Sequence, residues 1–85
     1  MHPLRAKFER ELKIRGRAER TIHAYVACVR ALTKHYQNRA PDQIGDEEIR
    51  DWLYHLRIAR RLSASSLNVA VNAVRAFHAL VLGRA

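Results

Sequence analysis

Apolar residues recur at helical spacing in four successive segments of this 85-residue chain, and this periodicity restricts the fold class. Glycine, proline and serine turn signals separate the segments. No stretch alternates polar and apolar residues as a strand would, and no internal repeat is present. The pattern predicts one small all-α domain over residues 1–85, a four-helix bundle with helices at about residues 3–15, 18–37, 46–60 and 63–82.

The last segment has two different faces, and Ser63 is the expected N-cap of its helix. The side expected to face the core carries Leu67, Ala70, Val71, Val74, His78 and Val81. The other side has no carboxylate and carries Arg61, Ser65, Asn68, Asn72 and Arg75. Arg and Asn make paired contacts with guanine and adenine edges, and Ser suits phosphates or either base. This segment is therefore predicted to lie against DNA.

The second segment carries a basic strip that is also free of acids. The strip consists of Arg20, His23, Ala27, Arg30 and Lys34. Small alanines between cations would let a helix approach a phosphate backbone closely, but such a strip is equally typical of a solvated helix face. The spacing alone leaves both interpretations open.

Three residues outside these strips carry specific structural expectations. Trp52 is predicted to be the largest core side chain, and Ile44 to anchor the loop before the third helix. Cys28 has no second cysteine to pair with, and its apolar surroundings predict a buried structural thiol.

Charge is unevenly distributed along the chain, whose formal net charge is +8. Residues 42–51 hold five of the eight acids, whereas residues 52–85 hold five arginines and no acid. A generic soluble surface would not need this segregation. An anion-facing side and an acidic back explain it better, and nucleic acid is the usual partner of an Arg-rich basic domain.

Several functions lack the residues that they would require. The five histidines fall on different segments without Cys or carboxylate at ligand spacing, so we predict no metal site. There is no Gly-rich phosphate loop and no nucleophile in a recognisable setting, so we predict no catalytic residues and no cofactor. No apolar run is long enough to span a bilayer, which excludes a membrane partner and leads us to expect a cytoplasmic protein.

Three stretches together resemble a known family. They are RGRAERTIHAY at residues 15–25, IGDEEIRDWL at residues 44–53, and LSASSLN through RAF at residues 62–77. In this order and spacing they are similar to the N-terminal core-binding (SAM-like) domain of tyrosine recombinases, the phage- and integron-type integrases. The sequence departs from the family pattern at Ala18 and Gly45, which replace capping residues, and at His78, which replaces a tyrosine.

The resemblance implies a SAM-like bundle that clamps a recombination site together with a C-terminal catalytic domain. The second and fourth helices would face the major groove, and the other partners would be further recombinase protomers on double-stranded DNA. Strand cleavage by a tyrosine nucleophile would belong to the catalytic domain, which we expect to lie outside these residues. The chain by itself is therefore not expected to be an enzyme, and Tyr25, Tyr36 and Tyr54 are not expected to be nucleophiles.

The basic strips and the resemblance lead to the same set of DNA-binding candidates. Arg20, Arg30 and Lys34 are expected at phosphates, and Asn68, Asn72 and Arg75 at base edges. The full predicted set is Arg17, Arg20, Thr21, Arg30, Lys34, Ser63, Ser65, Asn68, Asn72 and Arg75.

Two alternative functions stay open from the sequence. A helical interaction module could use its basic surface to dock an acidic protein partner. A small helix-turn-helix regulator would need a tight glycine-containing turn, and the turn at residues 60–62 has no glycine.

Overall fold

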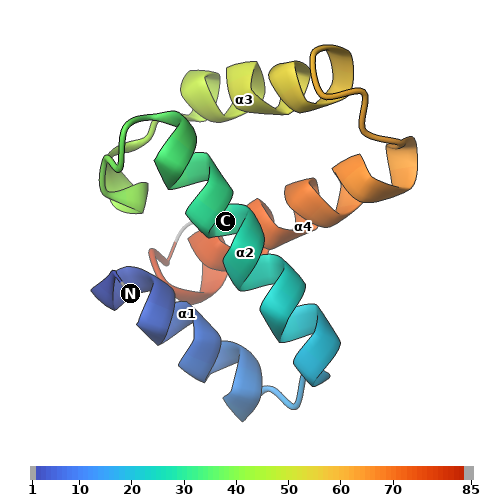
Figure 1. Ribbon diagram of the computed structural model, residues 1–85. Coiled ribbons are helices and arrows are strands. Elements are labelled where there is room, and N and C mark those ends of the chain that lie inside the picture. The colour runs from blue at the N-terminus through green and yellow to red at the C-terminus, as the bar shows by residue number, and fades with distance from the viewer. Residues whose placement is uncertain (1, 84–85) are drawn as a thin grey trace.

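Helices α2 and α4 cross near the centre of the computed structural model, which describes residues 2–83 (Figure 1). The elements in chain order are α1 (Pro3–Ile14), α2 (Glu19–His35), the 3-10 helix η1 (Pro41–Gln43), α3 (Asp46–Ile58) and α4 (Ala64–Leu80). The predicted all-α class is confirmed, and each α-helix begins and ends within two residues of its predicted bounds. The η1 turn lies in a stretch predicted only as a loop.

Two hydrophobic clusters share α2 and α4. Phe8 and Leu12 of α1 pack with Ile22, Val29 and Phe77 in one cluster. The other cluster joins α3 to the two central helices through Leu32, Ile44, Ile49, Trp52, Ala70 and Val74. Trp52 is 2% exposed and Ile44 is 1% exposed, which confirms both as core residues. The thiol of Cys28 is only half-buried, so the expectation of a buried cysteine is too strong.

The buried face of α4 is rotated from the face that the periodicity indicated. Its buried residues are Ala70, Ala73, Val74 and Phe77. Leu67, Val71, His78 and Val81 were expected inside but are half-buried. We attribute the rotation to Ala70 and Ala73. Their small side chains let α2 approach closely, so the centre of the α2–α4 contact lies at these two residues.

Three helix starts differ in how their first N–H groups are capped. The Ser63 hydroxyl accepts a bond from the backbone N–H of Ser66 at 3.2 Å, which confirms it as the N-cap of α4. Ala18 offers no side-chain acceptor to α2, as its replacement of a capping residue implied. At α3 the backbone N–H of the N-cap residue Gly45 donates to Glu48 Oε1 at 3.0 Å. Glycine has no side-chain oxygen that could accept a hydrogen bond from the first N–H groups of the helix.

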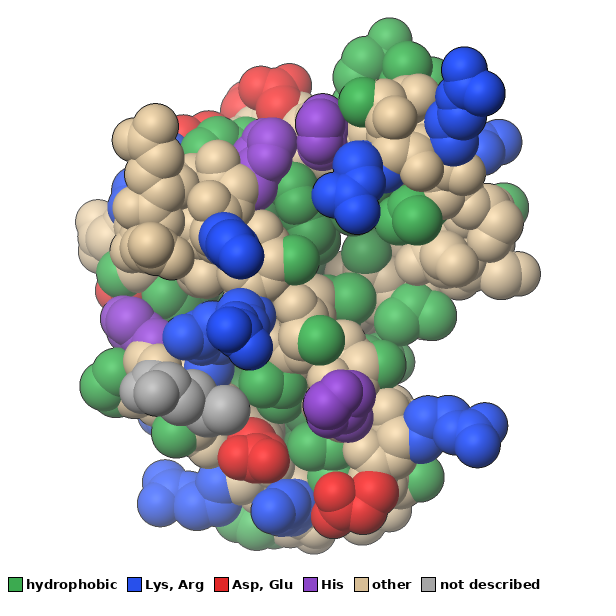
Figure 2. All heavy atoms as spheres, in the orientation of Figure 1, with side chains coloured by type: hydrophobic (Ala, Val, Ile, Leu, Met, Phe, Trp, Pro, Cys, Tyr) green, Lys and Arg blue, Asp and Glu red, His purple; other side chains and the backbone are tan. Residues whose placement is uncertain are grey.

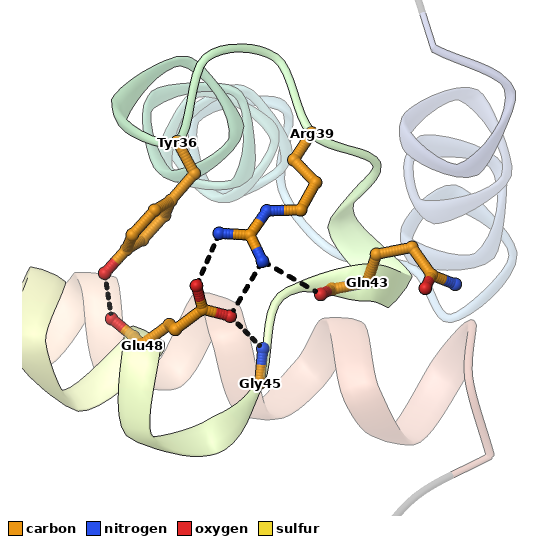
Figure 3. A network of polar contacts seen from close by, with 5 residues as sticks. All are labelled: Tyr36, Arg39, Gln43, Gly45 and Glu48. Atoms are coloured by element: carbon orange, nitrogen blue, oxygen red, sulfur yellow. Dashed lines mark hydrogen bonds and ion pairs between the residues drawn. The ribbon is translucent and has the colours of Figure 1, made fainter.

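A polar network fixes α3 against the end of α2 (Figure 3). The Tyr36 hydroxyl donates to the backbone carbonyl of Glu48 at 2.6 Å. Both terminal nitrogens of the Arg39 guanidinium donate to the Glu48 carboxylate, one of them at 3.0 Å. The guanidinium carbon also lies 5.2 Å from the centre of the Tyr36 ring. These contacts hold the first turn of α3 against the segment that follows α2.

Candidate nucleic-acid interface

The outer strip of α2 faces solvent along its whole length. We define this strip as Arg20, His23, Ala27, Arg30 and Lys34, all of which are exposed. The opposite side of α2 is buried through Ile22, Val29, Leu32 and Thr33. The buried Thr33 hydroxyl is satisfied because it donates to the Arg30 carbonyl at 2.9 Å. The helix therefore presents its cations outward from a well-packed base.

The two flanks of α2 differ in charge. On the α1 side, a groove of about 460 Å³ includes the acids Glu9 and Glu19 among its lining residues. On the α3 side, a groove of about 300 Å³ is lined by Ala31, Lys34, His35, Trp52, His55, Leu56 and Arg60. The second groove contains no carboxylate. The α3 side of α2 is therefore the side where a polyanion would meet the less repulsion.

The first turns of α2 and α4 lie on the same side of the molecule, at the right of Figure 1. The space-filling view is indented between them (Figure 2). This arrangement brings one group of predicted residues toward a common side: Arg17, Arg20, Thr21, Ser63 and Ser65. All are exposed except Thr21, which is half-buried.

The remaining predicted residues are not all brought to this side. Asn68, Asn72 and Arg75 are exposed on the side of α4 opposite its buried face. Because α2 packs on that buried face, these residues and the outer strip of α2 point away from the α2–α4 contact in different directions. Arg30 and Lys34 lie further along α2, where Arg30 lines the groove on the α1 side and Lys34 lines the groove on the α3 side.

Glu9 and Glu19 share the α1 groove with Arg30 of the outer strip, and some of the acids are held in internal contacts. Glu9 lies 3.9 Å from the Lys13 ammonium on α1. Arg39, followed by the N–H of Gly45, lowers the pKa of Glu48 by hydrogen bonding to its carboxylate. No acid follows Asp51 in the sequence, so the end of α3, the turn and all of α4 are acid-free.

Sequence reasoning missed three candidate contacts on this side. His35 and His55 are twenty positions apart in the chain, yet their ring centres lie 4.9 Å apart. Only the packing of α2 against α3 brings them together, so no sequence spacing could have shown the pair. Val69 is 39% exposed on α4, where the helical pattern had assigned it to neither the core-facing side nor the polar side.

Neither a metal-binding cluster nor a membrane-spanning helix is found among the described residues. Within residues 2–83, no three His, Cys, Asp or Glu side chains come close enough to hold a metal ion together. None of the helices in this range has both the length and the apolar character that crossing a bilayer requires.

Residues 2–83 form a four-helix all-α domain, and comparison with known proteins specifies the family of this domain. The family model of the phage integrase N-terminal SAM-like domain matches residues 4–85. The chain therefore belongs to the family of phage integrase N-terminal SAM-like domains.

A similar protein is described as "Putative integrase/recombinase y4qK" of Sinorhizobium fredii (strain NBRC 101917 / NGR234). It is 30% identical to this chain over 84 residues, which cover 99% of this chain and 27% of the relative. The chain thus spans about a quarter of the length of that relative. No solved structure gives a significant match.

Proposed function

We propose that this chain is the DNA-binding core-binding domain of a tyrosine-type site-specific recombinase. The observation that carries the proposal is the basic surface that runs from the outer strip of α2 across the α3 groove to the end of α3 and the start of α4, because no carboxylate lines that groove. Family membership supports the same assignment, because the family is defined by the N-terminal domains of integrases. Duplex DNA would lie against this side.

The dimensions of α2 support contacts on both edges of the major groove. Arg20 and Lys34 are fourteen residues apart, which corresponds to roughly 21 Å along a helix. The major groove is only about 12 Å wide, so the two cations can reach phosphates on either edge. Thr21 and Ser65 lie nearer the first turns, where they would approach base edges or sugars.

The rest of the recombination reaction belongs to partners of this domain in the proposal. Residues 1–85 would form one clamp half, and a C-terminal catalytic domain would form the other half and cleave the DNA. Further protomers would occupy the same recombination site, in the cytoplasm of a bacterium that carries the mobile element. The greater length of the integrase/recombinase relative supports an additional domain in such proteins.

Salt-dependent DNA binding tests the proposal. Fluorescence anisotropy of a random-sequence duplex should give a Kd on the order of 10⁻⁴–10⁻⁶ M and a log–log salt slope near −4 to −5 for about five phosphate contacts. In an Arg20→Ala/Lys34→Ala variant, affinity should fall about tenfold or more and the slope should shrink by about 2. Arg75→Ala tests whether the outer side of α4 also takes part.

The matched control is Lys7→Ala/Arg10→Ala, which removes one lysine and one arginine from the exposed surface of α1. Its affinity should fall by much less than that of the α2 variant. No binding by a folded sample at about 50 mM salt would refute DNA contact by this domain. Equal losses in the two variants would refute the α2 surface as the site.

A further inference from the structure

The groove between α2 and α3 has the composition of an anion site. Its rim carries Lys34 and His35 from α2, His55 from α3, and Arg60 from the turn after α3. Trp52 is 2% exposed and forms part of the apolar wall. Figure 2 shows two histidine side chains next to each other near the top of the molecule, with a basic side chain below them on one side and an acidic side chain above them. We propose that this groove binds a phosphate of the DNA backbone through these four side chains.

The two imidazoles are placed to act on one ligand. Their ring centres lie 4.9 Å apart and their planes are tilted by 40°. An oxyanion between them could accept a hydrogen bond from one N–H of each ring. Lys34 and Arg60 line the same groove, so a phosphate there could have up to four donor side chains, from α2, α3 and the turn after α3.

The permanent charges favour an anion over a metal ion in this groove. A pair of histidines could in principle ligate a transition metal. However, Lys34 and Arg60 would repel a divalent cation, and no carboxylate or thiol lines the groove to compensate. The same two cations attract a phosphate.

Neighbouring titratable groups do not reverse this balance. On α2, Tyr36 follows His35, and the two rings meet edge to face at 4.9 Å. On α3, Asp51 lies one turn before His55. Partial burial and then the charges of Asp51 and Glu48 raise the pKa of Tyr36, so Asp51 acts on the Tyr36 side of the groove. The negative charge of Asp51 is therefore outnumbered by the permanent cations Lys34 and Arg60, which line the groove together with two imidazoles.

DNA is the source of the phosphate because the groove adjoins the surface proposed to bind it, so this inference rests on the proposed function. Lys34 belongs both to the outer strip of α2 and to the groove. Arg30 lies one turn before Lys34, about 6 Å along the helix. A backbone that follows the strip would therefore reach the groove at the end of α2.

The pair of histidines predicts a pH response that lysine and arginine contacts would not produce. Imidazole is the side chain that ordinarily changes charge between pH 5 and 8, and the protonated ring donates from both nitrogens. Affinity for a random-sequence duplex should therefore rise about three- to tenfold from pH 8 to pH 6 at constant ionic strength. In a His35→Gln/His55→Gln variant this rise should be largely lost.

His2→Asn is the control for general titration, because His2 caps α1, lines neither groove, and is replaced by another N-capping residue. It should keep most of the pH response. Arg60→Ala should reduce the salt slope by about 1 at both pH values. Persistence of the full pH response in the double glutamine variant, or an unchanged salt slope in Arg60→Ala, would overturn the groove as a phosphate site.

Histidine NMR signals identify the source of the phosphate. The imidazole resonances of His35 and His55 should shift on addition of a short duplex at near-stoichiometric amounts, and should respond to inorganic phosphate only at millimolar concentrations. Saturation by inorganic phosphate at lower concentrations than by duplex would overturn DNA as the ligand. Failure of duplex binding at every pH refutes the proposed function, whereas salt-dependent binding without the histidine response refutes only the groove.

Discussion

Glu48 is an acid that stabilises the fold of this basic molecule without weakening the attraction of the molecule for a polyanion. Its carboxylate accepts bonds from Arg39 and from the N–H of Gly45, and its backbone carbonyl accepts from Tyr36. The residue thus joins the end of α2, the loop and the first turn of α3. Its negative charge is matched by Arg39, so it does not add an unpaired acid to the α2–α3 surface.

This network makes a specific prediction about acid stability. The bonds from Arg39, followed by the bond from Gly45, lower the pKa of folded Glu48. A lowered folded pKa gives stability that is present above the unfolded pKa, about 4.3, and is lost as pH falls through the folded value. Thermal midpoints measured by circular dichroism should therefore fall more steeply below about pH 4.5 in the wild type than in Glu48→Gln.

The control is Glu47→Gln, which removes a neighbouring exposed acid that accepts none of the network's hydrogen bonds. Its midpoints should follow the wild type. Parallel curves for wild type and Glu48→Gln would show that the network contributes nothing to acid stability.

At the scale of the helices, small side chains decide how α4 meets α2. Ala73 is 0% exposed and Ala70 is 3% exposed, whereas the larger Val69 is partly in solvent. Alanine at a crossing point allows the two backbones to come close, and nearby large residues then pack beside the contact. The orientation of α4 follows, and with it the direction in which Asn68, Asn72 and Arg75 point.

The Ala73→Val variant tests this account. Two added methyl groups at a fully buried alanine should separate α2 from α4 and destabilise the domain by about 1–3 kcal/mol. Ala79→Val, on the exposed side of the same helix, should cost only about 0.5 kcal/mol through helix propensity. Urea unfolding followed by circular dichroism would measure both. Similar losses in the two variants would show that Ala73 is not a packing constraint.

Helix periodicity and turn residues predicted the four helices well because these signals are local. Pro3 at the start of α1, Gly16 after its end and Ser63 at the start of α4 act within one turn of their own positions. The rotation of α4 and the pairing of His35 with His55 depend on contacts between helices. Local signals therefore identified the exposed strips but not their relative directions, and the ten predicted DNA contacts stay a prediction.

At the scale of the whole molecule, the two hydrophobic clusters are coupled because both contain parts of α2 and α4. In a domain of 85 residues, neither cluster has a separate set of helices that could hold it together alone. We therefore expect one cooperative unfolding transition. Trp52, the single tryptophan, reports on the α3 cluster, and Phe8 belongs to the α1 cluster.

Phe8→Leu is the variant that tests this coupling. Phe8 is 0% exposed and packs edge to face against Phe77, with ring centres 5.4 Å apart. Loss of the aromatic pair at nearly constant volume should cost about 1 kcal/mol. If the domain unfolds as one unit, the urea midpoint followed by Trp52 fluorescence should fall as far as the midpoint followed by circular dichroism. If the Trp52 midpoint stays at its wild-type value while the helical signal shifts, α1 unfolds separately, and its contacts with α2 and α4 do not help to hold the proposed DNA-binding side.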